Sequence, residues 1–188
     1  MTPFLLHLLR HGAPAQPGKL MGHTDGEPCE HGILDCIAKV RDLDVAAIAA
    51  SDLRRARVAG DAVADLLSLP LTIDQRWREI DFGAWDGLTS DEIDPESLGR
   101  FQDDPDANPP PGGERWSALI ERVGNAIGQL APRPTLIITH GGAMRAALAH
   151  LCRMDHHQTW AFDLPYAARL SLKVWPGERF MAQIIGLS

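Results

Sequence analysis

The stretch that decides the fold is FLLHLLRHG, residues Phe4 to Gly12, an apolar run that ends in Arg10 and His11 and turns at Gly12. A short run of Leu and Phe that is bounded by a turn signal predicts a buried strand. In open α/β sheets, ligands bind outside the carboxyl ends of such strands. We therefore expect Arg10 and His11 to lie at a ligand-binding edge.

A second stretch, far along the chain, has the same design. Residues Thr135 to Gly142 read TLIITHGG, again an apolar run that ends in a histidine and a glycine turn. Carboxyl ends of neighbouring strands meet at one edge of a sheet. His11 and His140 are therefore expected to share one site.

Strand and helix periods alternate along the rest of the chain. Further strands are expected at residues 45–50, 70–73, 169–175 and 180–185. Amphipathic helices are expected to begin near residues 32, 51, 114 and 142, the second of them capped by Ser51. Residues 91–113 are rich in acidic residues and proline, so we expect an irregular excursion over the carboxyl edge of the sheet. This alternation predicts an α/β fold.

Composition narrows the class of protein. A chain of 188 residues with 45% hydrophobic content suits one core, so residues 1–188 are expected to form a single domain. A formal charge of -7 argues against a nucleic-acid or anionic-membrane partner. Cys29, Cys36 and Cys152 form no CxxC pair, which fits a reducing compartment and a cytoplasmic location. The apolar amino-terminal run predicts neither a signal peptide nor a membrane span.

The residues at the expected site suit phosphate chemistry. An imidazole can serve as an uncharged nucleophile near neutral pH, and an adjacent guanidinium presents a fork that matches phosphate oxygens. Gly12, Gly141 and Gly142 would let backbone N–H groups approach an anion. A histidine after a strand is also a common hydrogen-bonded core residue, and we expect that structural role for His7.

Five motifs, in order along nearly the whole chain, carry a resemblance to a known family. They are LLRHG at 8–12, SDLRRA at 51–56, REIDFGAWDG at 78–87, PGGE at 111–114 and THGG at 139–142. They resemble the motifs of the histidine phosphatase superfamily, which also includes the phosphoglycerate mutases. The resemblance implies a three-layer α/β/α sandwich with a mostly parallel central sheet.

The resemblance also implies a covalent mechanism. His11 would attack phosphorus and become a phosphohistidine, while Arg10, Arg55 and His140 would hold the phosphoryl oxygens. Glu79 would protonate the departing alkoxide and then deprotonate water. No metal and no cofactor are implied.

Further contacts to the phosphate or substrate are expected from Gly12, Gly141, His23 and Thr24. The loop from Pro14 to Cys29 departs from the family pattern, because proline and glutamine stand where relatives have hydroxyl and amide side chains.

Two assignments stay open at the level of sequence. Helical geometry does not exclude Arg54 in place of Arg55 as the phosphate ligand. Glu79 could instead be a surface carboxylate that pairs with Arg76 or Arg78.

Two weaker signals indicate whether the chain resembles the phosphatases or the mutases of this family. The short segment between Glu79 and His140 favours hydrolysis over mutase chemistry, and the Gly22 to Asp25 loop is similar to that of small bacterial phosphatases of the alpha-ribazole phosphate type. We expect a metal-independent phosphomonoester hydrolase that acts on a small phosphorylated metabolite, as a monomer or a homodimer. The alternatives are a phosphoglycerate mutase-type phosphotransferase and a catalytically weak protein that binds phosphate esters.

Overall fold

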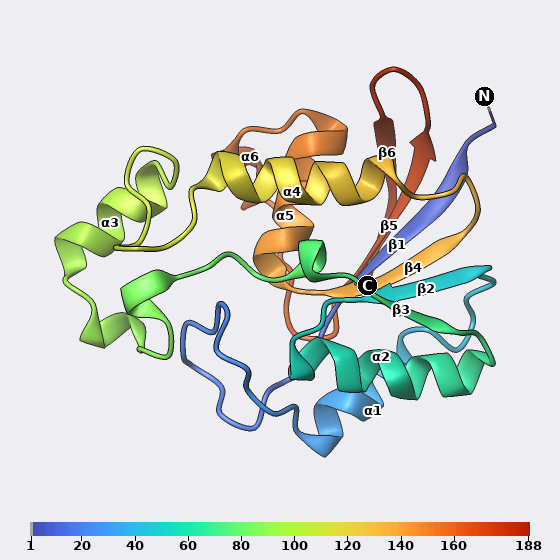
Figure 1. The fold of residues 1–188 in the computed structure, drawn as a ribbon, viewed down its shortest axis with the longest axis horizontal. Helices are drawn as coiled ribbons and strands as arrows, with labels where there is room; N and C mark the ends of the chain where they lie inside the picture. Colours follow the sequence, from blue (N-terminus) through green and yellow to red (C-terminus); the bar gives the residue numbers. More distant parts are fainter. Residues whose placement is uncertain (1) are drawn as a thin grey trace.

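A computed structural model describes residues 2–188 and shows one six-stranded sheet with the strand order β3-β2-β4-β1-β5-β6 (Figure 1). The strands are β1 (Phe4–Arg10), β2 (Ala47–Ala50), β3 (Leu71–Ile73), β4 (Thr135–Thr139), β5 (Arg169–Trp175) and β6 (Met181–Leu187). Strands β1 to β4 run parallel, whereas β5 lies antiparallel to β1 and forms a hairpin with β6. The expected mostly parallel sheet is confirmed.

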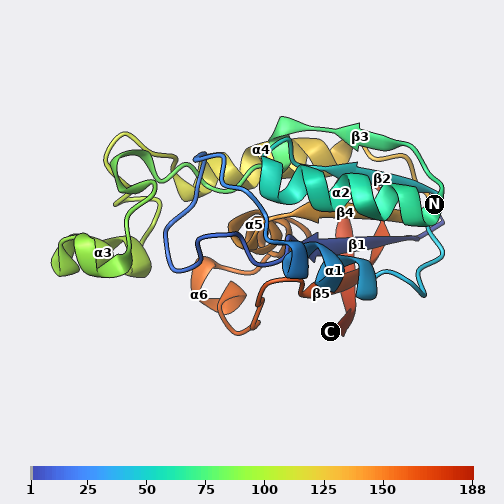
Figure 2. The same ribbon diagram turned by 90° about the horizontal axis from the view of Figure 1, so that it is seen from below.

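Helices cover both faces of this sheet. The α-helices of the described chain are α1 (Glu30–Ala38), α2 (Arg54–Leu67), α3 (Pro95–Asp103), α4 (Trp116–Gly128), α5 (Gly141–Cys152) and α6 (His156–Thr159). Helices α1 and α2 lie on one face, and α4 and α5 lie on the other (Figures 1 and 2). The layers therefore form the expected α/β/α sandwich.

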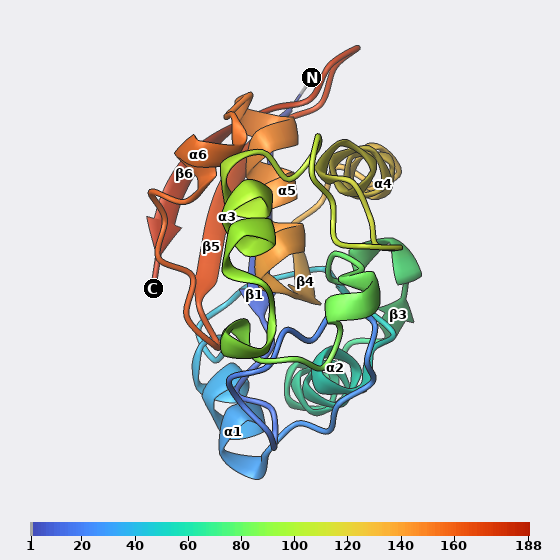
Figure 3. The same ribbon diagram turned by 90° about the vertical axis from the view of Figure 1, so that its left-hand side faces the viewer.

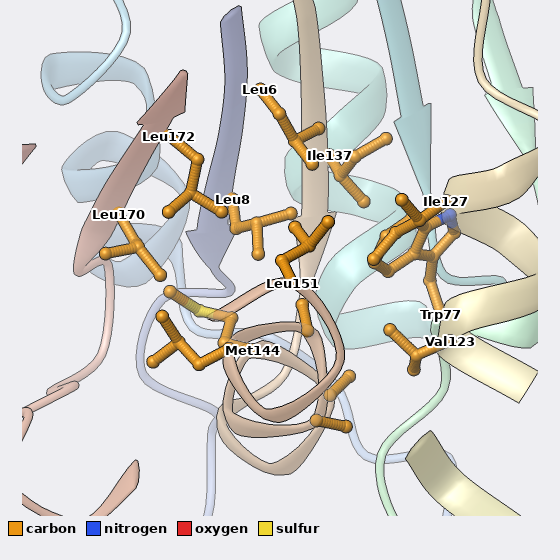
Figure 4. Close-up of a cluster of buried hydrophobic side chains, with 14 of the residues drawn as sticks. Leu6, Leu8, Trp77, Val123, Ile127, Ile137, Met144, Leu151, Leu170 and Leu172 are labelled. Atoms are coloured by element: carbon orange, nitrogen blue, oxygen red, sulfur yellow. The ribbon is translucent and has the colours of Figure 1, made fainter. Parts of the chain in front are cut away.

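Successive side chains of the central strands point to opposite faces of the sheet, so each face has its own part of the hydrophobic core. Leu6 and Leu8 pack with Ile137 into the cluster beneath α4 and α5 (Figure 4), whereas Leu9 packs with Ile138 against α1 and α2. Complete burial of a Leu or Ile side chain stabilises a fold by about 1.5–3 kcal/mol. The apolar runs that end in the two candidate histidines thus anchor both layers.

Two expectations about local structure are wrong. Ser51 does not cap α2, which begins at Arg54; its hydroxyl instead accepts a hydrogen bond from the backbone N–H of Leu53 at 3.3 Å. Residues 91–113 are not wholly irregular, because they contain α3, which Asp94 caps and Pro95 begins. Helix α3 projects beyond the carboxyl end of β1 (Figures 1 and 2), and Figure 3 views the molecule from that side.

His7 has the structural role expected of it. Its side chain is buried, and its Nδ1 lies 2.8 Å from the hydroxyl of Ser171 on the neighbouring strand β5.

No helix within residues 2–188 combines the length and the apolar character needed to cross a membrane.

Candidate active site

The sheet register brings the two strand-end histidines together. Arg10 at the end of β1 pairs with Thr139 at the end of the parallel strand β4, so the next residues are His11 and His140. The backbone N–H of His11 donates to the carbonyl of Thr139 at 2.8 Å. The two imidazole rings meet edge to face with their centroids 5.0 Å apart. His11 and His140 therefore lie side by side, as the sequence predicts.

The environment of His11 fixes its tautomer. Its Nδ1 lies 2.7 Å from the carbonyl oxygen of Gly12, and a carbonyl only accepts, so Nδ1 carries the proton. Burial, reinforced by the cation of Arg55, lowers the pKa of His11 to about 3. The ring is therefore neutral at physiological pH, and Nε2 retains its lone pair.

His140 is equally protected from protonation. Its side chain is completely buried, and burial followed by the charge of Arg55 lowers its pKa well below the usual value. Among the described residues, neither of its ring nitrogens finds a hydrogen-bond partner. A neutral imidazole of this kind can donate one hydrogen bond to an anion.

Two guanidinium groups complete the cluster. Arg10 donates to the carbonyl of Leu164 at 2.6 Å, and its guanidinium carbon lies 4.3 Å from the ring centroid of Tyr166. Arg55 donates to the carbonyls of three residues in the loop that follows β1, which are Met21, Gly22 and Thr24. Within residues 2–188, the buried Nε atoms of both arginines lack a partner. Buried donors without partners are rare in proteins and point to a bound acceptor.

Arg54 takes a different position from Arg55. It is exposed and pairs with Glu27 at 2.7 Å, and its backbone N–H is capped by Asp25. The geometry therefore favours Arg55 at the candidate site.

A cavity of about 140 Å³ adjoins these groups. His140 does not line it, although its ring contacts that of His11. The cavity walls include Arg10, His11, Arg55 and Glu79, together with Lys19 and Tyr166. Sequence reasoning missed the last two residues. Lys19 is the only cation between Ala13 and Cys29, and Tyr166 is the only tyrosine of the chain. Both signals are visible in the sequence, but neither indicates where the side chain lies.

Glu79 lies on the wall of this cavity. Its carboxylate accepts hydrogen bonds from the backbone N–H groups of Ile80 at 2.9 Å and Gly142 at 3.0 Å. The surface alternative is not supported, because Arg76 pairs with Asp74 and Arg78 pairs with Asp52.

The contact between Glu79 and α5 also explains Gly142. A Cβ atom on this residue would lie 2.1 Å from Oε1 of Glu79. The N–H of Gly142 therefore serves the carboxylate, and not an anion as expected from the sequence. The positive end of the α5 dipole then lies near the carboxylate charge.

A second motif positions the backbone beneath Glu79. Glu114 of the PGGE motif binds Arg122 through two hydrogen bonds of 2.7 and 2.8 Å. Arg122 in turn donates to the carbonyls of Arg76, Arg78 and Glu79. Sequence reasoning did not identify Arg122, because the carbonyls to which it donates belong to residues more than 40 positions away.

His23 and Thr24 are not brought to the cavity. They are not among the residues that line it, although Lys19, Leu20 and Met21 of the same loop are, and Asp86 accepts the backbone N–H groups of both. The His23 ring is turned toward the Glu79 carbonyl, with Nε2 at 3.2 Å, and toward the Asp81 carboxylate, with Nδ1 at 3.6 Å. The expectation that they face the substrate is thus replaced by a role in anchoring the loop.

Gly12 is required for a different reason from the one expected. A Cβ atom there would lie 1.9 Å from the backbone oxygen of Gly32 in α1. Close approach between two backbone segments, and not approach to an anion, therefore excludes a side chain at this position. Gly141 has more space, since its Cβ would lie 3.5 Å from the guanidinium of Arg10.

Among residues 2–188, no three His, Cys, Asp or Glu side chains are grouped so that they could hold a metal ion.

One neutral histidine, two guanidinium groups and a carboxylate line this small cavity, and a second neutral histidine contacts the ring of the first. Fixed donors of this kind can bind a tetrahedral oxyanion. The model of the histidine phosphatase superfamily (branch 1) matches residues 6–184, and the chain belongs to this superfamily.

Three relatives show how far the similarity extends. A bifunctional protein of Mycobacterium tuberculosis is 34% identical over 159 residues, which are 80% of this chain and 42% of that protein. The chain thus spans less than half the length of this relative. A glucosyl-3-phosphoglycerate phosphatase of Mycolicibacterium vanbaalenii is 30% identical over 78% of this chain and 73% of its own length. The structure of a mycobacterial glucosyl-3-phosphoglycerate phosphatase with VO3 has a TM-score of 0.85 at 25% identity, covering 97% of this chain and 98% of that one.

Proposed function

We propose that this protein is a metal-independent phosphomonoester hydrolase that acts on a small phosphorylated metabolite through a phosphohistidine at His11. One observation carries the proposal: the neutral His11 directs its Nδ1 proton to the Gly12 carbonyl and keeps the Nε2 lone pair free. Relatives named as phosphatases of a phosphorylated sugar acid support the same class of reaction.

The first chemical step forms a bond between Nε2 of His11 and phosphorus while the bond from phosphorus to the ester oxygen breaks. The charge on the transferring phosphoryl group must be met by fixed donors. Arg10, Arg55 and His140 would supply these donors, and each has a buried donor atom that lacks a partner in the described chain. Loss of one such donor typically costs about 3 kcal/mol, or roughly a hundredfold in rate.

Glu79 serves as the proton donor in this proposal. Its carboxyl group gives a proton to the departing alkoxide and then takes one from the water that attacks the phosphohistidine. Hydrogen bonds from Ile80 and Gly142 keep both carboxylate oxygens in place. The second displacement returns the electron pair to Nε2 and releases inorganic phosphate.

The direct test is hydrolysis of p-nitrophenyl phosphate by the purified protein. We expect turnover that His11→Ala abolishes, that vanadate inhibits as a phosphorane mimic, and that EDTA leaves unchanged. Loss of activity in EDTA that is restored by zinc or magnesium would overturn the metal-independent mechanism. Absence of hydrolysis, with retained binding of phosphate esters, would instead establish the binding protein considered above.

A mutase is distinguished by the fate of the phosphoryl group. One relative, from Erwinia tasmaniensis, is named a probable phosphoglycerate mutase and is 26% identical over 74% of this chain. Incubation with labelled 3-phosphoglycerate should release inorganic phosphate if the enzyme is a hydrolase. Label that moves to the 2-position of the product would establish the mutase.

The free cysteines add a proposal about location. Cys29, Cys36 and Cys152 are all unpaired in the fold, and burial raises the pKa of the Cys36 thiol to about 12. A protein that keeps its thiols reduced fits the cytoplasm. We propose that residues 1–188 act there as one domain.

A further inference from the structure

A second cavity adjoins the phosphate-sized one across Glu79. It measures about 260 Å³ and shares Arg10, Leu20, Glu79 and Phe82 with the smaller cavity. A proton donor has to contact the oxygen that leaves, so the alcohol of a phosphate ester must lie on the Glu79 side of the phosphorus. This inference rests on the proposed function, and it makes the second cavity the place for the leaving group. We call it the leaving-group chamber.

The walls of the leaving-group chamber are mainly aromatic and aliphatic. Its lining includes the side chains of Ile80, Phe82, Leu98, Phe101, Trp116 and Trp160. These residues come from the segment after Glu79, from α3, from the start of α4 and from the end of α6. Segments far apart in sequence therefore contribute rings to one space.

The aromatic wall is already packed before any ligand enters. Phe101 of α3 meets Phe82 edge to face with centroids 6.2 Å apart, and it meets Trp85 in the same manner at 5.6 Å. Rings held in such contacts present fixed faces and edges, so a ligand does not have to order them. A flat apolar ring is the group that this wall accommodates best.

Arg145 supplies a polar group to the lining of the leaving-group chamber. Its guanidinium carbon lies 4.2 Å from the Trp160 ring centroid, and one terminal nitrogen donates to the carbonyl of Phe162 at 3.1 Å. Its buried Nε lacks a partner within residues 2–188. Sites for small molecules combine a mostly apolar lining with a few fixed polar groups, and Arg145 fits that description.

We propose that the substrates are phosphate monoesters of alcohols that carry an apolar ring, with the ring seated in the leaving-group chamber between Phe101 and Trp160. A small polyol or hydroxy acid would leave these walls without apolar contact. The chamber is also smaller than the ~300–1,000 Å³ of typical drug-sized sites, which limits the leaving group to a modest size.

The test compares esters of primary alcohols, so that differences in leaving-group basicity do not dominate. Benzyl phosphate, ethyl phosphate and 3-phosphoglycerate are each assayed for released phosphate. Burial of one ring is expected to raise kcat/KM for benzyl phosphate roughly ten- to a hundredfold over ethyl phosphate. Phe101→Ala should reduce this ratio by about tenfold.

Trp160→Ala is a second variant that avoids a folding defect, because the Trp160 residue is 61% exposed. It should also lower the ratio of benzyl to ethyl phosphate turnover. Trp175→Ala is the matched control, since Trp175 ends β5 beyond Val174, which pairs with Phe4 at the opposite end of β1 from the site. This control should leave the ratio unchanged.

The outcomes separate the two proposals. Equal turnover of benzyl and ethyl phosphate, or a preference for 3-phosphoglycerate, would overturn the ring assignment and leave the phosphatase intact. A benzyl preference that survives both Phe101→Ala and Trp160→Ala would place the ring elsewhere and overturn the chamber. Failure to hydrolyse any of the three esters, with p-nitrophenyl phosphate also untouched, would overturn the proposed function and the ring assignment together.

Discussion

Substitution of Gly142 by Ala should separate the role of Glu79 from the stability of the fold. The added Cβ would lie 2.1 Å from Oε1 of Glu79, so the carboxylate must move by more than an ångström to reach ordinary contact. That movement involves the free end of a flexible side chain. It costs about one of the two hydrogen bonds that the carboxylate accepts, from Ile80 to Oε1 or from Gly142 to Oε2, which is about 1.5–3 kcal/mol. Alanine recovers about 1 kcal/mol through its helix propensity.

The catalytic effect should exceed the effect on stability. A displacement of about 1 Å can cost roughly a hundredfold in rate. For Gly142→Ala we expect kcat for benzyl phosphate to fall roughly a hundredfold, because its departing alkoxide needs a proton. For p-nitrophenyl phosphate, whose leaving group needs little protonation, we expect a loss of less than about tenfold.

The matched control is Gly128→Ala at the end of α4, where an added Cβ has no neighbour within 4 Å. It should leave both rates unchanged. Steady-state kinetics with the two esters, together with urea unfolding of each variant, complete the assay. Equal losses for the two esters in Gly142→Ala would refute the assignment of Glu79 as proton donor.

Three further perturbations have defined outcomes. Gly12→Ala should lower the free energy of unfolding in urea by about 3 kcal/mol or more, because its Cβ would lie 1.9 Å from the Gly32 backbone oxygen and neither main chain can yield cheaply; an unchanged midpoint would contradict this. His11 has its pKa lowered to about 3, so the unfolded chain binds the extra proton and stability falls as pH drops below 6.5. From pH 6.5 to 5, His11→Gln should therefore lose about 2 kcal/mol less than the wild type, and parallel losses would be inconsistent with a buried neutral ring. Arg145→Met should reduce the preference for 4-carboxybenzyl phosphate over benzyl phosphate by about tenfold, judged by kcat/KM, and no change would remove Arg145 from substrate recognition.

The sequence predicts the centre of the fold well because its signals there are local. The runs before His11 and His140 are apolar on both faces of the sheet and stop at glycine turns, so strand type, direction and shared edge all follow. The final hairpin follows equally from its Pro-Gly turn.

Prediction fails where the deciding contact comes from elsewhere in the chain. Helix α2 begins three residues after Ser51 because Asp25, from the loop after β1, accepts the N–H of Arg54 at 2.6 Å. Helix α3 has a local signal in Asp94 and Pro95, but its nine residues offer too short a period to stand out.

The candidate site shows the same difference between local sequence signals and contacts from distant parts of the chain. The motif residues His11, just after a strand, and Arg55, in the first turn of a helix, both reach the cavity. Lys19 and Tyr166 reach it through loops, whose course no local pattern fixes. His23 stands in a matching motif, yet its backbone N–H binds Asp86 and it does not line the cavity. A motif thus predicts the chemistry of a side chain more reliably than it predicts what that side chain contacts.

The most direct measurement of the central claim is rapid quenching with a labelled phosphate ester, followed by mapping of any phosphoryl group on the protein. The account predicts phosphohistidine at His11, bonded through Nε2, formed at least as fast as turnover and absent from His11→Ala. Label on Nδ1, on another residue, or on no residue during rapid turnover would contradict it.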